Sequence, residues 1–313
     1  MSNDPFGRGG QQARQPAPAR RGLLGNVRWW ILLLFAGYAA FSWFGSRETD
    51  PYTGEDARYG ATPAEESQLG AQAYQQVLGE AQSQGALLPP DHPTSQQIRQ
   101  IAQRLVARVP QVAADLAAMN NQPAPDLSSY QWDVNVIQSD EANAFCLPGG
   151  KIAVYTGLIP VTQNADAMGV VMGHEIAHAL QRHGAQRMAQ QKLVQMGQMA
   201  VGVAGVDPSV MSAIGAGMQY GLVLPYGRSH ESQADKVGLM LAAAACFNPQ
   251  EAIPLWERMG KLGGGQRPPE FASTHPDPAN RIQQLQQWMP QAMQFYEKYC
   301  GKGATAIPGT ASN

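Results

Sequence analysis

The chain has 313 residues, of which 44% are hydrophobic and 15% are charged, and its 22 Lys and Arg against 24 Asp and Glu give a formal net charge of −2. This near-neutral balance argues against a basic nucleic-acid-binding protein, so we expect no nucleic acid partner. Three Cys in a chain of this length are too few for a disulfide scaffold. The low charge raises the possibility that part of the chain lies in a membrane.

The amino-terminal region predicts a membrane anchor. Residues 1–28 contain five Arg and one acidic residue and are expected to form a disordered basic arm. Residues 29–46 carry no charge and have three Trp near their ends, which is typical of a short transmembrane helix of the ~17–25 residues required. By the positive-inside rule the arm stays in the cytoplasm and the rest of the chain is exported. A cleaved signal peptide, with a small-x-small site at Gly37-Tyr38-Ala39, is the alternative.

The remainder reads as one α+β domain. Residues 47–63 are polar with several Pro and Gly and are expected to be a linker, residues 64–300 form the domain, and residues 301–313 are a flexible tail. Helical periodicity begins near Leu69, a second helix starts at a Thr94 cap, and a short third helix covers residues 112–119. Alternating residues 130–136 and the apolar run 151–157 predict strands, so a small sheet lies among helices.

The sharpest chemical signal is His174-Glu175-Ile176-Ala177-His178, in a segment of helical pattern. Residues four apart lie about 40° apart around a helix, so both imidazoles face one metal ion. Two neutral nitrogens at this spacing suit Zn²⁺, and the intervening Glu175 can act on a water without being a ligand. One zinc ion per chain is therefore the expected cofactor.

A catalytic zinc needs a third protein ligand. His183 is excluded, because nine residues after His174 it lies on the opposite side of the helix, so we expect it to pack or to support a ligand. Glu231 is the better candidate, because Asp235 shares its helix face and can accept the outer N–H of a ligand histidine. His230 competes with Glu231 but has no acidic residue four positions later.

Four motifs in order resemble the membrane-linked zinc metalloendopeptidases that include HtpX, BepA and the CAAX prenyl proteases: residues 143–150, HEIAHA, ESQAD and residues 273–281. The resemblance covers about residues 69–289. It implies a gluzincin-type, zincin-like fold with His174, His178 and Glu231 as ligands and Glu175 as the general base. It also makes His275 an oxyanion-stabilising residue and Arg281 its partner.

Substrate contacts are expected from the segment that begins at Asn143, Ala144 and Phe145, because an edge strand can bind an extended peptide through its backbone. Such binding favours unfolded or misassembled proteins as substrates. Residues 193–227 hold one charged residue and predict a helical hairpin or lid over the site, with insertion into a membrane as the alternative. Cys246 and Cys300 could form the one disulfide, which would leave Cys146 free; three free thiols are the alternative.

Together these features predict a single-pass zinc endopeptidase at a bacterial inner membrane, with its amino terminus cytoplasmic and its catalytic domain in the periplasm. Its expected role is quality control of envelope proteins. The alternative function is a chaperone or assembly factor for envelope proteins that rarely cleaves them. The sequence leaves the oligomeric state open.

Overall fold

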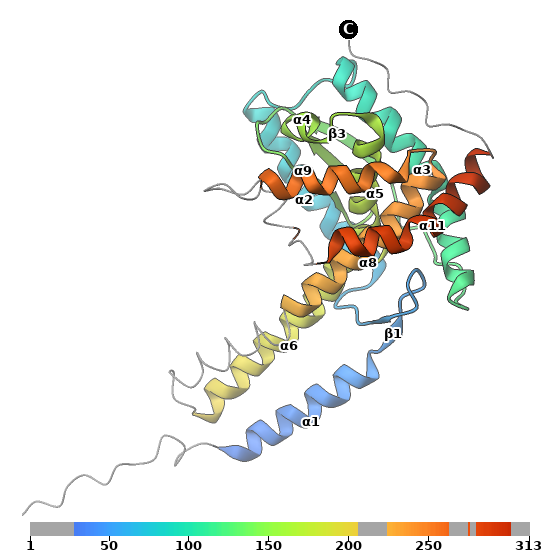
Figure 1. The fold of residues 1–313 in the computed structure, drawn as a ribbon. Helices are drawn as coiled ribbons and strands as arrows, with labels where there is room; N and C mark the ends of the chain where they lie inside the picture. Colours follow the sequence, from blue (N-terminus) through green and yellow to red (C-terminus); the bar gives the residue numbers. More distant parts are fainter. Residues whose placement is uncertain (1–27, 206–223, 263–274, 276–279, 302–313) are drawn as a thin grey trace, which may run out of the picture.

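The computed structural model describes residues 28–205, 224–262, 275 and 280–301, and its elements are labelled in Figure 1. The predicted arm, the tail and the middle of the predicted hairpin (206–223) therefore lie almost wholly outside the described residues. The main helices are α1 Trp29–Gly45, α2 Pro63–Ser83, α3 Pro93–Met119, α4 Ile159–Thr162, α5 Ala165–Leu180, α6 His183–Ala204, α8 Leu224–Ala244, α9 Ala252–Leu262 and α11 Arg281–Cys300. The strands are β1 Glu48–Thr49, β2 Asp56–Ala57, β3 Asp133–Ile137, β4 Ala144–Leu147 and β5 Lys151–Tyr155.

A three-stranded sheet lies against the helices, in the order β3-β5-β4. Strand β3 runs parallel to β5, and β4 runs antiparallel to it. The fold is therefore mostly helical with a small sheet, as predicted, and β4 lies at one edge of that sheet. The sheet and helices α3, α5, α8 and α11 share one hydrophobic core.

Helix α5 passes through the middle of this core (Figure 1). Asn164 caps its start, because its side-chain Oδ1 accepts a hydrogen bond of 2.7 Å from Ala167 N. Nearly every residue from Ala167 to Leu180 is buried, so tertiary packing rather than one amphipathic face holds the helix. The His174–His178 segment on this helix is consequently held in a fixed position by the surrounding core.

Helix α3 corrects two sequence predictions. It starts after His92, whose Nδ1 accepts from Thr94 N at 3.2 Å, rather than at a Thr94 cap. It also continues through Pro110 to Met119, where a separate short helix was predicted. An interior proline costs about 3 kcal/mol, but Val109, Val112 and Leu116 are buried around it. Burial of side chains of this size is worth roughly 1.5–3 kcal/mol each, which outweighs that cost.

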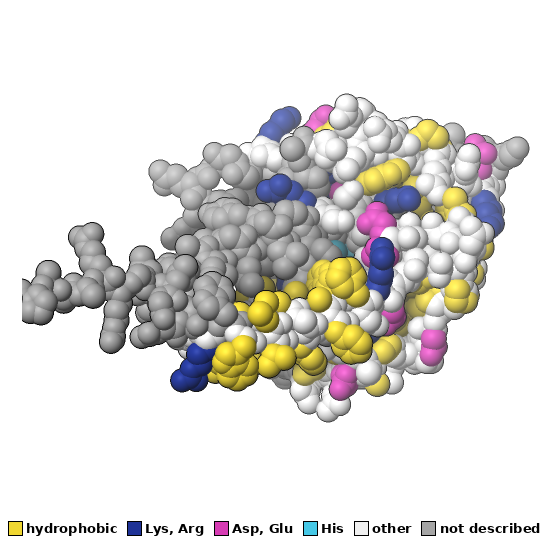
Figure 2. Space-filling model, turned by 90° about the horizontal axis from the view of Figure 1, so that it is seen from below, with side chains coloured by type: hydrophobic (Ala, Val, Ile, Leu, Met, Phe, Trp, Pro, Cys, Tyr) yellow, Lys and Arg dark blue, Asp and Glu magenta, His cyan; other side chains and the backbone are white. Residues whose placement is uncertain are grey.

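Helix α1 forms where the apolar segment predicted one, but no helix among the described residues is long and apolar enough to cross a membrane. This finding contradicts the predicted single-pass topology. Helix α1 lies beside α6, and Arg28 N donates to Ala204 O at 2.9 Å (Figure 1). Hydrophobic side chains gather on the face of the molecule seen from below in Figure 2.

The residues predicted as a linker contain a small hairpin instead of extended chain alone. Strands β1 and β2 pair antiparallel, and the loop between them carries the buried side chains of Asp50 and Tyr52. Asp50 Oδ2 accepts from Gln181 Nε2, at the carboxyl end of α5, at 3.2 Å. The hairpin is thus fastened to the helix that carries the His-Glu-x-x-His sequence.

Candidate metal centre

Helix α5 brings its two histidines together. His174 Nε2 and His178 Nε2 lie 3.0 Å apart, as expected for residues one turn apart that face the same point. Burial lowers the pKa of His178 to about 3. Burial acts in the same sense on His174, but hydrogen bonds with Asp235 and Glu231 raise its pKa overall, to about 9.

Helix α8 crosses α5 at a contact between two glycines. A Cβ on Gly238 would lie 2.6 Å from His174 N, and one on Gly173 would lie 2.8 Å from Gly238 O. Both distances are too short for real side chains, so this close crossing requires glycine. The crossing brings Glu231, from one end of α8, to the two histidines.

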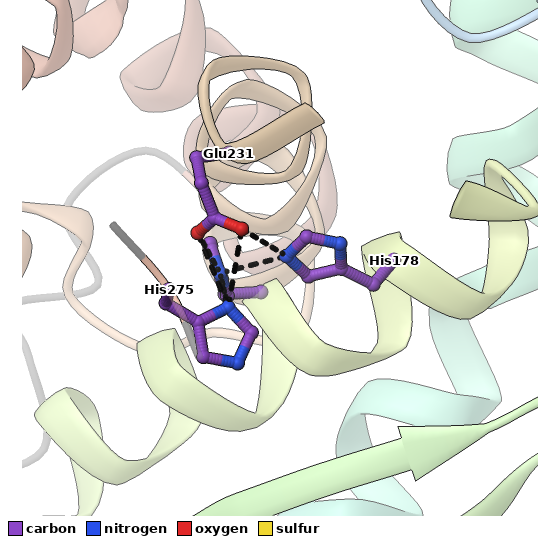
Figure 3. A group of neighbouring side chains, drawn as sticks. His178, Glu231 and His275 are labelled. Atoms are coloured by element: carbon purple, nitrogen blue, oxygen red, sulfur yellow. Dashed lines mark hydrogen bonds and ion pairs between the residues drawn. The ribbon is translucent and has the colours of Figure 1, made fainter. Parts of the chain in front are cut away.

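Four donors converge at this point: His174, His178, Glu231 and His275 each offer a ligand atom within 4.8 Å of the others. Figure 3 shows the Glu231 carboxylate directed at both His178 and His275. Its Oε1 lies 3.5 Å from His178 Nε2, and its Oε2 lies 3.1 Å from His275 Nδ1. Imidazole nitrogens and a carboxylate are donors that zinc prefers, so the residues present fit this metal.

Glu175 lies beside the cluster but is not one of the four donors. Its side chain is buried, and Oε1 has no hydrogen-bond partner among the described residues. His275 Nε2 is 3.5 Å from this oxygen. Burial raises the pKa of Glu175, although the neighbouring histidines act against the rise. A buried carboxylate whose oxygen accepts no hydrogen bond, next to a donor cluster, is placed to exchange a proton with a bound molecule.

Asp235 and Arg281 lie behind the cluster, and Arg281, which was predicted to be the partner of His275, pairs with the carboxylates of Asp235 and Glu231. Asp235 Oδ1 lies 2.9 Å from His174 Nδ1. Arg281 forms a fork with the same carboxylate, at 2.6 Å from Nε and 3.1 Å from Nη2, and its guanidinium lies 3.5 Å above the Trp256 ring. Burial opposes ionisation of Asp235, but the charge of Arg281 and the His174 hydrogen bond lower its pKa overall.

His183 and His230 lie outside the donor cluster. His183 Nδ1 is 2.8 Å from His178 Nδ1, on the side away from the donors, so it contacts a candidate ligand without being one. His230 stacks on His183 with ring centroids 4.1 Å apart. Burial lowers the pKa of His183 well below its usual range.

Two further residues around His183 were not predicted. Gln233 Oε1 lies 3.0 Å from His183 Nε2, and Gln233 Nε2 donates to Glu55 Oε2. Gln233 stands two residues after Glu231, a spacing with no regular meaning on a helix. Glu55 is an acidic residue in a polar stretch, so no signal in the sequence could have identified it.

The predicted substrate segment forms part of the edge strand. Tyr155 N donates to Asn143 O at 3.0 Å, and Ala144 opposes Val154. Because hydrogen-bonded pairs alternate along an antiparallel ladder, the backbone groups of Ala144 and Cys146 face away from β5. Asn143 and Phe145 therefore use their backbone groups within the sheet.

A comparison of the sequence with known protein families matches "Peptidase family M48" over residues 103–289, more than half of the chain. The chain belongs to peptidase family M48. This confirms the predicted resemblance and the enzyme class, a metallopeptidase. The M48 match and the four-donor cluster also confirm zinc as the cofactor.

Relatives of this M48 chain include mitochondrial and bacterial proteases. It is 33% identical over 228 residues to mitochondrial metalloendopeptidase OMA1 of Schizosaccharomyces pombe, covering 72% of this chain and 62% of that protein. It is 31% identical to mitochondrial metalloendopeptidase OMA1 of Saccharomyces cerevisiae, with coverage of 87% and 77%. With the beta-barrel assembly-enhancing protease of Escherichia coli the identity is 25%, and the coverage is 86% and 54%.

These M48 relatives correct the predicted location. The proteins with 31–33% identity named above are mitochondrial, which contradicts the assignment to a bacterial inner membrane and periplasm. The predicted single-pass topology fails independently, because none of the described helices could span a membrane. The predicted role in quality control of envelope proteins assumed the bacterial location that these relatives contradict.

Proposed function

We propose that this chain is a zinc-dependent endopeptidase that cleaves extended segments of unfolded or misassembled proteins. The observation that carries the proposal is the buried Oε1 of Glu175, which accepts no hydrogen bond from the described residues and lies beside four converging metal donors. The relatives' printed names, metalloendopeptidase and protease, agree with cleavage within protein chains.

In this proposal His174, His178 and Glu231 hold the zinc, which when bound would activate water and polarise the scissile carbonyl. Glu175 Oε1 takes a proton from the attacking water and later delivers it to the leaving amine. Asp235 keeps the outer nitrogen of His174 protonated, so that Nε2 presents a lone pair to the metal. Arg281 forms ion pairs with both buried carboxylates, Glu231 and Asp235, and so offsets part of their negative charge in the protein interior.

His275 has the role of hydrogen-bond donor to the oxyanion. In the described arrangement its Nδ1 is a fourth donor, whereas a catalytic zinc keeps its fourth position open. We therefore expect His275 to leave this position before it acts on the oxyanion. The His275→Ala variant should keep one zinc per chain but lose about 10²–10³-fold in kcat, as measured with a fluorogenic protein substrate. Unchanged turnover would rule out this role for His275.

An extended substrate segment is expected to pair with the open edge of β4. The backbone groups of Ala144 and Cys146 face this edge, and pairing through backbone reads little side-chain identity. Native proteins rarely expose extended segments, whereas unfolded or misassembled chains do. This is the physical reason for the proposed substrate class, and it refines the predicted contacts from Asn143, Ala144 and Phe145 towards Ala144 and Cys146.

The decisive variant is Glu175→Gln. It should bind one zinc per chain, because Glu175 is not a donor, and should lose about 10²–10⁴-fold in cleavage of an unfolded protein such as casein. Glu80→Gln, an exposed carboxylate on α2, is the matched control and should cleave casein like the wild type. Casein cleavage at the wild-type rate by Glu175→Gln would disprove the base assignment.

A further inference from the structure

The two candidate histidine ligands differ in how their outer nitrogens are held. A metal-binding histidine commonly donates its second ring N–H to a carboxylate, which fixes the tautomer and the ring orientation. His174 does so directly, through Asp235 Oδ1 at 2.9 Å. The outer nitrogen of His178 faces another imidazole, His183 Nδ1, at 2.8 Å.

A chain of three contacts connects His178 to a carboxylate at the protein surface. His183 Nδ1 lies against His178, His183 Nε2 lies 3.0 Å from Gln233 Oε1, and Gln233 Nε2 donates to Glu55 Oε2. His183 is 1% exposed and Gln233 is 8% exposed, whereas Glu55 is exposed. The chain therefore runs from solvent, through two buried side chains, to the metal centre.

The donor and acceptor groups of these side chains allow only one direction of hydrogen bonding along this series of contacts. An ionised carboxylate can only accept, so Gln233 must direct its NH₂ group at Glu55 and its carbonyl oxygen at His183. His183 then donates from Nε2 and accepts at Nδ1. His178 consequently donates from Nδ1, and its Nε2 presents a lone pair to the metal. Each bond in such a chain polarises the next one.

We propose that Glu55 is a positioning residue of the metal centre, which orients His178 through Gln233 and His183. This proposal rests on the proposed function, because it takes His178 as a zinc ligand. It gives both ligand histidines a carboxylate partner, Asp235 in direct contact and Glu55 through two intermediates. Glu55 itself contacts neither the metal nor the substrate.

The same series of hydrogen bonds connects the β1–β2 hairpin to the metal centre. Glu55 stands in the β1–β2 hairpin, where its backbone oxygen accepts from Asp50 N at 2.8 Å, and Asp50 is fastened to Gln181 at the end of α5. Glu55 reaches Gln233 only while the hairpin is docked. Because linkage is reciprocal, zinc binding stabilises the docked hairpin by as much as docking strengthens zinc binding.

The test is the zinc affinity of the full chain, measured by competition with a chromogenic chelator. Glu55→Gln keeps the size of the side chain but removes the charge that sets the direction, and it should weaken zinc binding about tenfold, at the lower end of the range for outer partners of metal ligands. Asp56→Asn is the matched control, because this neighbouring carboxylate pairs with Arg47 at the surface and should leave the affinity unchanged. Circular dichroism of the metal-free variants should show equal folding.

A double variant distinguishes an effect of Glu55 that passes through Gln233 and His183 to His178, which we call the relay, from a local effect of the substitution. Gln233→Met is nearly isosteric and cuts the chain, so Glu55→Gln added to it should change the zinc affinity less than twofold. An equal tenfold loss in both backgrounds, or no loss from Glu55→Gln alone, would overturn the relay. Unchanged zinc binding and casein cleavage in Glu55→Gln would refute the relay while the proposed function stands. A wild-type chain that binds no zinc would refute both.

Discussion

At the scale of single residues, Asp50 is a carboxylate buried away from the metal. It is 1% exposed, and its oxygens accept from Tyr52 N at 2.7 Å and from Gln181 Nε2 at 3.2 Å. Burial raises the pKa of Asp50 to about 6, although these hydrogen bonds oppose the rise. In the unfolded chain the pKa of an Asp is about 3.9. The folded state therefore binds this proton more tightly, and Asp50 lowers stability progressively as pH rises from about 4 to about 6.

Asp50→Asn should remove this dependence. The free energy of unfolding of the variant minus that of the wild type should grow between pH 4 and pH 6 and then stay constant, reaching at most about 3 kcal/mol for a shift of two pKa units. The buried Gln181 Oε1, which lacks a hydrogen-bond partner among the described residues, can accept from the new amide after a flip of Gln181. Urea unfolding with excess chelator measures the difference.

Asp126 supplies a control of opposite sign. It is exposed, and hydrogen bonds from Ser128 lower its pKa. The free energy of unfolding of the Asp126→Asn variant should therefore fall relative to that of the wild type as pH rises. A stability difference for Asp50→Asn that does not vary with pH would show that the carboxylate is not buried as described.

At the scale of elements, the crossing of α5 and α8 sets the geometry of the metal centre. Gly238→Ala would place a Cβ 2.6 Å from His174 N and 2.7 Å from its Cα, so the two helices must separate. We expect a loss of about 1–3 kcal/mol in the free energy of unfolding from this overpacking, and weaker zinc binding because Glu231 moves away from the histidines. Denaturant unfolding and chelator competition measure the two effects.

Gly79→Ala is the matched substitution, because Gly79 lies within α2 and a Cβ added there would meet no atom of the described residues within 4 Å. Alanine favours the helical conformation, so the free energy of unfolding of this variant should rise by up to about 1 kcal/mol. Its zinc affinity should not change. If Gly238→Ala behaved like Gly79→Ala, the close crossing would not exist in solution.

At the scale of the whole molecule, a disulfide between Cys246 and Cys300 joins the end of α8 to the end of α11. This is the predicted pairing, and Cys146 is buried and free, as expected. The bond closes a loop with a sequence separation of 54 residues, between the helix that carries Glu231 and the helix that begins at Arg281. It therefore restrains both helices that supply charges to the site.

Replacement of both Cys246 and Cys300 by Ala should lower the free energy of unfolding by roughly 2–4 kcal/mol, chiefly because the unfolded chain gains freedom. A reductant should shift the urea midpoint of the wild type and leave that of the variant in place. Thiol titration of the unreduced, denatured wild type should find one free thiol. A titration of three thiols would contradict the disulfide.

The sequence by itself determined the features that depend on spacing within one helix. His174 and His178 face one point, and Glu231 and Asp235 share a face, because residues four apart on a helix lie side by side. The motif order was enough to indicate the protease family. The strand periods were enough to predict a small sheet, although β3 begins at Asp133, later than the alternation suggested.

Only the tertiary structure decided what depends on distant segments meeting. The Gly173–Gly238 crossing, the direct contact of His183 with His178, and the chain from Glu55 through Gln233 join segments that no local period relates. The single helix through Pro110 was also decided by packing, because the buried side chains around the proline outweigh its local cost. A local pattern determines which side chains share a face, and the packing of the helices determines which faces meet.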